Sequence, residues 1–323
     1  MNRTPKISVL VPCYNVERYL RQCLDSISAQ TFNDMEILCL NDGSTDGTPA
    51  IIQEYADKDD RFILINKPNS GYGATMNVGL NTAKGKYIAI IESDDYIEPT
   101  MMEVLYNASE ENQLDLARCF YTVRDEVKGV DYVVDYPFSN MYNKTFCPLD
   151  EQEVFLIAPS IWVGLYNREF LNANNIRFLE TPGASYQDTS FAFKVYASAK
   201  RIMFIPEALH NYRINTNSSV TSPGKLFFVC TEDEEIRRYA REKGVYEELK
   251  ETLSLRAYGS YKWNYNRLST KTLKRQFIKR WAKDLRAQFK EGAITRRHFS
   301  KSRIFRLRVL SICSIVYYFT RKF

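Results

Sequence analysis

The chain has 323 residues, of which 45% are hydrophobic and 26% charged, and this ordinary usage excludes a disordered or fibrous protein. The net charge of +5 is unevenly placed: residues 267–323 contain 17 Lys and Arg but only Asp284 and Glu291, whereas the first 266 residues contain 27 Lys and Arg against 37 Asp and Glu. The acidic first part argues against nucleic-acid binding, and the tail is a separate basic segment.

Strand and helix patterns alternate four times in about the first 110 residues. The apolar runs predict strands over 6–12, 36–40, 62–65 and 87–91, with helices over 16–30, 47–58 and from the glycine-rich loop at 69–73 to about 83. This order predicts a parallel sheet covered by helices. In such sheets the ligand binds beyond the carboxyl ends of the strands.

Polar residues or glycines follow each of the four expected strands. In chain order they are Tyr14 with Asn15, Asp42, Gly71 with Gly73, and Glu92 with Asp94 and Asp95. Because the carboxyl ends of parallel strands meet at one edge of a sheet, we expect these residues to gather there. Four clusters at one edge indicate a ligand site more strongly than any cluster alone.

The fourth cluster, Glu92-Ser93-Asp94-Asp95, places three carboxylates within four residues. Crowded carboxylates repel one another unless they share a cation or a proton. A hard divalent cation, Mg²⁺ or Mn²⁺, that carries a substrate diphosphate would neutralise them. The alternative is a solvated turn that caps the next helix at Pro99, and the alignment with the other strand ends favours the cation.

The pattern is looser beyond residue 100. It predicts, in chain order, a strand over 115–123, an irregular aromatic stretch over 125–150, a segment over 160–171 that leads into a helix, a helix that opens at Gln187-Asp188, a short strand over 201–205 that ends at Pro206, and helices from about residue 225. We expect a catalytic domain over 1–222, with a donor half over about 1–100 and an acceptor half over about 101–222, and a helical, basic extension over 223–323.

The motifs form an ordered set. They are Pro12-Cys-Tyr-Asn15 with Glu17, Asn41-Asp-Gly-Ser-Thr-Asp-Gly-Thr48, Asn69-Ser-Gly71, Met76-Asn-Val-Gly-Leu80, Gly85-Lys-Tyr-Ile88 and Glu92-Ser-Asp-Asp95. This set resembles the family 2 glycosyltransferases of the A-type fold, densely over residues 6–100 and recognisably to about residue 222. The resemblance implies a Rossmann-like, mostly parallel α/β sheet and an inverting enzyme that uses a nucleotide-sugar, with UDP as the expected nucleotide.

The resemblance also implies roles for individual residues. The donor-binding set would be Pro12, Tyr14, Asn15, Glu17, Asp42, Gly71, Asn77, Glu92, Ser93, Asp95 and Arg213. Within it, Tyr14 and Glu17 would lie by the base and ribose, and Asp42 would hold the uracil. Leu209-His-Asn-Tyr-Arg213 with Ser218-Ser-Val-Thr221 would fold over the diphosphate.

Metal binding and catalysis are implied for a second group of residues. Asp94 would hold Mg²⁺ or Mn²⁺, and His210 is a further candidate ligand. Asp188 would be the catalytic base, and Trp162 and Gln187 would lie on the acceptor side.

Four positions depart from the family pattern. Glu92 stands where Asp is usual, Met76 where many members carry Arg, Gln187 where Glu precedes the base, and Gly164 where Lys is frequent. Gln187 therefore leaves Asp188 as the group that abstracts a proton. With Met76 in place of Arg, a contact to the phosphate or the base is either lost or supplied by another residue.

Several of these residues keep a structural alternative. Tyr14 and Trp162 are either stacking surfaces for a base and a sugar or aromatic core residues. Asp42 either accepts from a base or forms an Asx-turn before a helix. His210 either binds the metal or is hydrogen-bonded beneath a loop.

The implied reaction is a single displacement with inversion, in which Asp188 takes the proton of an acceptor hydroxyl. A metal-dependent sugar nucleotidyltransferase is a competing hypothesis, but such enzymes usually carry a basic, glycine-rich loop near the N-terminus, where this chain has Pro-Cys-Tyr-Asn. A non-catalytic nucleic-acid-binding protein is a third, suggested by the basic tail alone.

The compartment follows from what the chain lacks. The seven cysteines are scattered without paired metal-ligand spacing, which is typical of a reducing compartment. No apolar signal segment precedes the first strand, and no run of 18 apolar residues occurs. We expect a cytoplasmic protein.

The tail suggests a membrane surface. Residues 304–319 are apolar and aromatic and follow dense basic charge, but the uninterrupted part after Arg308 is too short to span a bilayer. A basic amphipathic segment is typical of peripheral binding to anionic lipid. This predicts attachment to the inner face of the cell membrane, a glycan or lipid-linked acceptor, and a role in surface polysaccharide or glycolipid assembly. The alternative is a helix that docks on the catalytic domain or on a homodimer partner.

Overall fold

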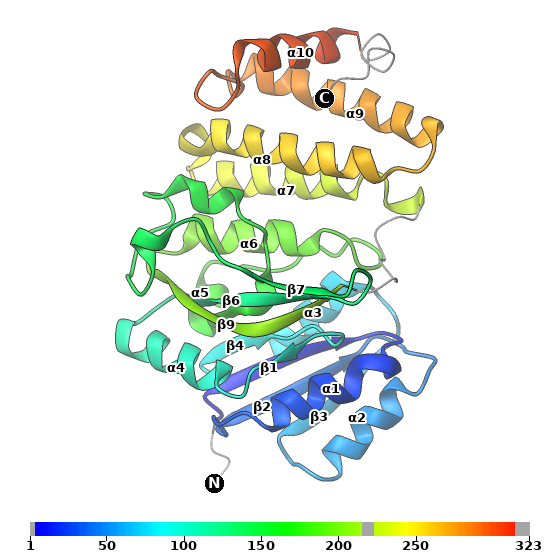
Figure 1. Ribbon diagram of the computed structural model, residues 1–323, viewed down its shortest axis with the longest axis vertical. Coiled ribbons are helices and arrows are strands. Elements are labelled where there is room, and N and C mark those ends of the chain that lie inside the picture. Colours follow the sequence, from blue (N-terminus) through cyan, green and yellow to red (C-terminus); the bar gives the residue numbers. More distant parts are fainter. Residues whose placement is uncertain (1–3, 215–222, 314–323) are drawn as a thin grey trace. The chain divides into compact units, whose positions relative to one another are not determined.

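The computed structural model describes residues 4–214 and 223–313 (Figure 1). The chain divides into two compact units, one of residues 1–151 with 159–218 and the other of residues 152–158 with 219–323. The expected diphosphate loop over 218–221 and the end of the tail, 314–323, lie outside the described residues.

The first unit begins with four parallel strands in the order β3-β2-β1-β4. They are β1 (Ile7–Cys13), β2 (Met35–Asn41), β3 (Phe62–Asn66) and β4 (Tyr87–Ile90). Every residue of β1, β2 and β4 is buried, which explains their continuous apolar runs. In Figure 1 these strands lie side by side in blue and cyan.

Helices connect these strands and cover the sheet. They are α1 (Glu17–Ser28), α2 (Thr48–Ala56) and α3 (Tyr72–Thr82). Helix α1 buries Leu20, Leu24 and Ile27, which the helical spacing places on one face. The chain moves from β1 to β2 to β3 and then crosses to β4, so right-handed connections put α1 and α2 on one face and α3 on the other.

Beyond β4 the sheet becomes mixed. Its order continues β8-β6-β9-β5, and β7 pairs with β6. These strands are β5 (Tyr96–Ile97), β6 (Leu116–Asp125), β7 (Val130–Val134), β8 (Gly164–Asn167) and β9 (Ile202–Ile214). Strand β8 is antiparallel to both β4 and β6, whereas β6 and β9 are parallel. The predicted parallel arrangement therefore holds up to β4.

Among the described residues, three helices and two short 3₁₀ turns complete the first unit. The helices are α4 (Met101–Asn112), α5 (Arg168–Ala173) and α6 (Gln187–Ser198), and the turns are η1 (Ser139–Met141) and η3 (Ile161–Val163). Three strands were not predicted: β5, which has two residues, β7 within the stretch expected to be irregular, and β8 within the segment expected to lead into a helix. Strand β8 has four residues, too few for an alternation pattern to show.

The prediction that a short strand ends at Pro206 is wrong. Strand β9 continues to Ile214, because the sheet accommodates the proline in a bulge. Cys119 of β6 pairs with Ile205, and Phe120 pairs with Ala208, so Pro206 lies unpaired and exposed between them. A proline has no N–H to donate to a ladder, and a bulge removes that requirement.

The second unit is helical over its described residues, as predicted. It contains η2 (Gln152–Leu156), η5 (Pro223–Lys225), α7 (Phe228–Glu242), α8 (Tyr246–Arg267), α9 (Lys271–Lys290) and α10 (Lys301–Ile312). Consecutive helices pack against each other, and their core includes Tyr261, Phe277 and Trp281. Within the described residues, the helices are too short or too polar to cross a membrane.

Candidate active site

The ends of the first three strands align at one edge of the sheet. Cys13 of β1 pairs with Asn41 of β2, and Asn41 pairs with Asn66 of β3. The residues that follow these three positions form what we call the strand-end row: Tyr14, Asp42 and Lys67. Tyr14 is 52% exposed, so its ring is open to a ligand rather than part of the core.

Asn15 and Glu17 hold the loop that follows β2. Asn15 has a φ of +51° and accepts through Oδ1 from the Thr45 backbone N–H at 2.8 Å. Glu17 accepts through Oε2 from the Gly47 N–H at 2.6 Å. These two predicted donor-binding residues therefore shape the loop beside Tyr14, whereas Pro12 is buried within β1.

Asp42 is buried and holds the loop that follows β3. Its Oδ1 accepts from the Ser70 N–H at 2.9 Å and its Oδ2 from the Gly71 N–H at 3.0 Å. The ammonium of Lys67 forms an ion pair with Oδ1 and contacts the Ser70 and Thr75 hydroxyls. Sequence reasoning missed Lys67, although its place directly after a strand could have singled it out.

Glu92 lies at the same edge, after β4. It is half-buried and accepts from the Tyr72 hydroxyl at 2.5 Å. The pKa of Glu92 is raised to about 8: burial is the largest cause, the hydrogen bond from Tyr72 acts against it, and the charges of Asp94, Asp95 and Asp188 add to it. The fold thus brings Asp188, from the second half of the chain, near the carboxylates that follow β4.

Asp95 is held from two sides by β9. Its side chain is 1% exposed, and its Oδ2 lies 2.9 Å from Nε2 of His210. Its Oδ1 accepts from the backbone N–H of Arg213 at 2.8 Å. The Arg213 guanidinium donates through Nε to the Asp94 carbonyl at 2.8 Å and also binds Glu126. Because β5 pairs with β9, these contacts follow directly from the sheet.

Two further predicted residues are enclosed near this position. Ser93 is buried between Glu92 and Asp94. Trp162, the predicted acceptor residue, is 9% exposed. Its ring lies parallel to Tyr212 at 5.0 Å and against His210 at 4.4 Å. This is the core packing that the sequence left as an alternative, and contact with a sugar would require it to open.

The side chains that could bind a metal at this edge fit a cation that takes most of its ligands from the substrate. No group of three His, Cys, Asp or Glu side chains suited to a metal occurs within residues 4–214 and 223–313. His210 is directed through Nε2 at Asp95, and Asp94 is partly exposed. Mg²⁺ is commonly bound by one or two carboxylates together with phosphate oxygens and water. Asp94 can serve in that way, whereas a cage built from protein side chains does not fit.

The segment over residues 178–187, which we call the 178–187 loop, lies against the start of α3. The Tyr72 N–H donates to the Gly183 carbonyl at 3.0 Å. A Cβ at Gly71 would lie 2.7 Å from Gly183 N, and a Cβ at Gly73 would lie 2.1 Å from the Leu179 carbonyl oxygen. Both glycines are therefore needed for this close approach, which is distinct from the donor contact expected of Gly71.

Two side-chain amides hold the 178–187 loop. Asn77 donates to the Phe178 carbonyl at 3.0 Å and accepts from its N–H at 2.9 Å. Gln187 donates to the Thr181 hydroxyl at 2.8 Å and to the Gly183 carbonyl at 3.0 Å, and accepts from the Ser185 N–H at 2.5 Å.

Asp188 follows at once, in the first turn of α6. Asn77 was predicted to bind the donor nucleotide-sugar and Gln187 to lie on the acceptor side. Both thus set the position of Asp188, the predicted catalytic base.

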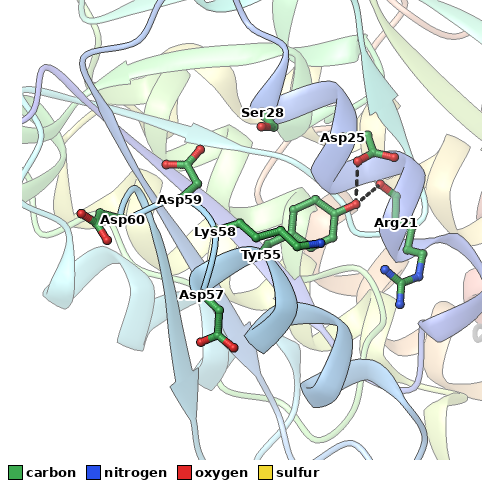
Figure 2. Close-up of a pocket in the computed structure, with 8 residues that line it drawn as sticks. All are labelled: Arg21, Asp25, Ser28, Tyr55, Asp57, Lys58, Asp59 and Asp60. Atoms are coloured by element: carbon green, nitrogen blue, oxygen red, sulfur yellow. Dashed lines mark hydrogen bonds between the residues drawn. The ribbon is translucent and has the colours of Figure 1, made fainter.

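A hollow of about 690 Å³ lies elsewhere on the first unit. Figure 2 shows its lining, with the Tyr55 hydroxyl between the Asp25 carboxylate and the Arg21 carbonyl. Its residues come from the later part of α1, the end of α2 and the turn before β3. They therefore lie at the amino ends of the strands, opposite the edge that carries the carboxylates.

Comparisons with known proteins show the family of the chain. A family model described as Glycosyl transferase family 2 matches residues 8–165. The glycosyltransferase GlyG of Streptococcus pneumoniae serotype 4 is 31% identical over 222 residues, which are 66% of this chain and 72% of GlyG. The chain belongs to glycosyl transferase family 2.

Other relatives of this family 2 chain are longer. EpsH of Bacillus subtilis (strain 168) is 35% identical over 231 residues, which are 70% of this chain and 65% of EpsH. The chain therefore spans less than two thirds of the length of EpsH, and the match to GlyA of Streptococcus pneumoniae covers 31% of that protein.

A solved structure confirms the fold of this family 2 chain. The crystal structure of S. aureus TarS 1-349 matches it with a TM-score of 0.74 and 22% sequence identity, over 97% of this chain and 89% of that chain. The predicted A-type fold, an α/β sheet covered by helices, is confirmed, including a C-terminal helical part.

Proposed function

We propose that the chain transfers a sugar from a UDP-sugar to an acceptor hydroxyl with inversion at the anomeric carbon. The observation that carries the proposal is the convergence at one sheet edge of the strand-end row, the carboxylates after β4 and Asp188 from the second half of the chain. S. aureus TarS, which shares the fold, has been crystallised in complex with UDP-GlcNAc.

The donor would lie across the edge, with its base over the strand-end row and its diphosphate near β4. The exposed Tyr14 ring would stack on the base, and Asp42 would accept a hydrogen bond from it. Asp94 would hold Mg²⁺ or Mn²⁺ against the diphosphate, and such a cation, when bound, stabilises the negative charge of the leaving group. A mannosyltransferase of Pyrobaculum calidifontis has been crystallised with GDP-Man and Mn²⁺.

The proposed chemistry needs one base. The acceptor hydroxyl gives its proton to Asp188 while its oxygen forms the new bond to the anomeric carbon. The bond from that carbon to the diphosphate oxygen breaks, and UDP leaves. Gln187 is a neutral amide and cannot take the proton, so the 178–187 loop serves to position Asp188.

The sugar is proposed to be a hexose or an N-acetylhexosamine, and the acceptor a growing surface polysaccharide or glycolipid. The chain is 30% identical over 237 residues to the poly(ribitol-phosphate) beta-glucosyltransferase of Bacillus spizizenii, covering 71% of this chain and 36% of that protein. Catalysis would belong to residues 1–222, with the donor half first, and residues 223–323 would form an extension.

The extension is proposed to bind the inner face of the cell membrane. Helix α9 exposes Lys279 and Lys283, and α10 exposes Phe305 and Ile312, a combination that suits anionic lipid. Vesicle co-sedimentation at low salt should be weaker for a variant with both lysines changed to Gln. Equal binding of the altered and unaltered proteins would favour the alternative, in which the tail docks on the catalytic domain or on a homodimer partner.

Product analysis tests the reaction class. Purified protein is incubated with UDP-hexoses and UDP-N-acetylhexosamines, with a membrane-lipid fraction and Mg²⁺ or Mn²⁺. Release of free UDP together with a glycosylated lipid product is expected. Release of pyrophosphate in its place would instead identify a sugar nucleotidyltransferase.

A further inference from the structure

We propose that Lys67 binds the nucleobase of the donor and, together with Asp42, selects a base that carries an N–H beside a carbonyl. The inference rests on the proposed nucleotide-sugar function, and it assigns a base-selecting role to a residue outside the predicted site. It starts from position: strand register places Tyr14, Asp42 and Lys67 at one level across three neighbouring strand ends.

The position favours a base over another part of the ligand. The chain adds β2 and β3 on one side of β1 and then returns to add β4 on its other side. Ligands of such sheets bind at the point between β1 and β4, beyond the carboxyl ends of the strands. The negative charge of the carboxylates after β4 suits a cation that carries the diphosphate, so the base would lie at the other end of the edge. The exposed ring of Tyr14 is the stacking surface on the other side, and Lys67 and Asp42 lie next to it in the row.

The Lys67–Asp42 pair presents a donor and an acceptor side by side. The Lys67 side chain is 14% exposed and that of Asp42 is 7% exposed, so both are largely withdrawn from water. Asp42 accepts from Lys67 and from the Ser70 and Gly71 N–H groups. A carboxylate has about four acceptor positions, so one remains for a ligand N–H.

Lys67 also has a contact that a ligand can replace. Its ammonium carries three N–H groups and lies near four acceptors, of which the Thr75 hydroxyl, at 3.2 Å, is the most distant. Thr75 is buried, so its hydroxyl stays in place, but the ammonium can turn that N–H to a base carbonyl without separating the ion pair. The buried Met76, which follows Thr75, brings no charge to this region.

The chemistry of the pair distinguishes bases of the same size. Uracil carries N3–H between two carbonyl oxygens, so N3–H can donate to Asp42 while the C4 carbonyl accepts from Lys67. In the same orientation cytosine presents an unprotonated N3 to the carboxylate and its C4 amino group to the ammonium, so a lone pair would face the negative charge and N–H donors would face the positive one. A site built to hydrogen-bond one group discriminates strongly against the analogue that lacks it, because buried polar groups are then unpaired.

Calorimetric titration of the full chain with UDP and with CDP, in Mg²⁺, tests the inference. We expect the unaltered protein to prefer UDP by at least about 10²-fold. Lys67→Met should weaken UDP binding by about 10- to 100-fold, as expected for one charged hydrogen bond, and CDP binding much less. Lys67→Arg, which keeps the cation, should retain part of the preference. Lys58→Met, which changes a lysine of the hollow in Figure 2, is the matched control and should leave both affinities unchanged.

The ratio of the two affinities separates base recognition from support of the loop. If Lys67→Met weakens UDP and CDP equally, or leaves UDP unaffected, the inference is overturned. If that variant does not fold, Asp42→Asn decides: its amide can donate to cytosine N3, so the preference for UDP should fall, and an unchanged ratio overturns the inference. A protein that selects UDP through Lys67 but releases no UDP from any UDP-sugar would contradict only the proposed function.

Discussion

The strand-end row and the 178–187 loop position their side chains in different ways. The row consists of residues that follow buried parallel strands, so strand register alone brings Tyr14, Asp42 and Lys67 to one level. The loop has no strand to support it, and it is held by side-chain amides and by two glycines of another segment. A substitution in the row should therefore act on the ligand it touches. A substitution around the loop should act on Asp188 from a distance.

The largest effect is expected at the sheet edge itself. Asp94→Asn should remove activity and weaken metal-dependent UDP binding, because Asn keeps the shape of the side chain but not its charge. UDP release, and UDP titration with and without Mg²⁺ or Mn²⁺, measure the two effects. Asp60→Asn, in the hollow of Figure 2, is the control. Unchanged turnover of Asp94→Asn, or full activity of the unaltered protein in excess chelator, would refute the metal role.

The next effect is expected at the end of the loop. Asp188→Asn should lower turnover by about 10²- to 10⁴-fold, the range of general-base contributions. UDP affinity should be retained, because the proposed base faces the acceptor. Turnover under saturating donor and the dissociation constant of UDP are the two measurements. A collapse of donor affinity with normal turnover per bound donor would make Asp188 a binding residue instead.

A glycine substitution tests whether close contact supports the loop. Gly73→Ala would place a Cβ 2.1 Å from the Leu179 carbonyl oxygen, so we expect a loss of about 1–3 kcal/mol in the free energy of unfolding and a lower turnover. Gly259→Ala, also in a helix, meets nothing within 4 Å and should be neutral or stabilising by about 0.5–1 kcal/mol. Urea unfolding of both variants provides the comparison. Equal shifts would mean that the loop does not depend on this contact.

The smallest effect is expected when one side-chain amide of the 178–187 loop is replaced by a carboxylate. Gln187→Glu replaces an N–H donor with a carboxylate facing the Thr181 hydroxyl and the Gly183 carbonyl. We expect turnover to fall by about 10-fold with unchanged UDP affinity, since one hydrogen bond is lost and the loop shifts. Gln276→Glu, exposed on α9, serves as the control. A parallel loss of UDP affinity would show that Gln187 acts on the donor.

Local patterns were sufficient for the first half of the fold. The predicted strands over 6–12, 36–40, 62–65 and 87–91 agree with β1 to β4 within about two residues, because each is a continuous apolar run that ends at polar residues. The alternation of strands and helices then determined the parallel order and the common edge. The second half lacked these features, since β8 is short and β9 passes through a proline.

The candidate site divides in the same way. Asp42, Glu92, Asp94 and Asp95 could be predicted because they directly follow strands, but their partners could not. The Tyr72 hydroxyl on Glu92 joins residues 20 apart, and the His210 ring on Asp95 joins residues 115 apart. Nothing in the local pattern at Tyr72 distinguishes it from a core aromatic residue.

By itself, the sequence determined a parallel sheet covered by helices, the edge at which the candidate site lies and the residue types available there, because hydrophobic periodicity depends on near neighbours along the chain. The A-type fold was implied by the resemblance of its motifs. Only the tertiary structure decided that Gly71 and Gly73 admit the 178–187 loop, that Gln187 holds it and that Lys67 pairs with Asp42. These contacts depend on distances of a few ångströms between separate segments. Such distances are set by the packing of the whole unit, which no local pattern records.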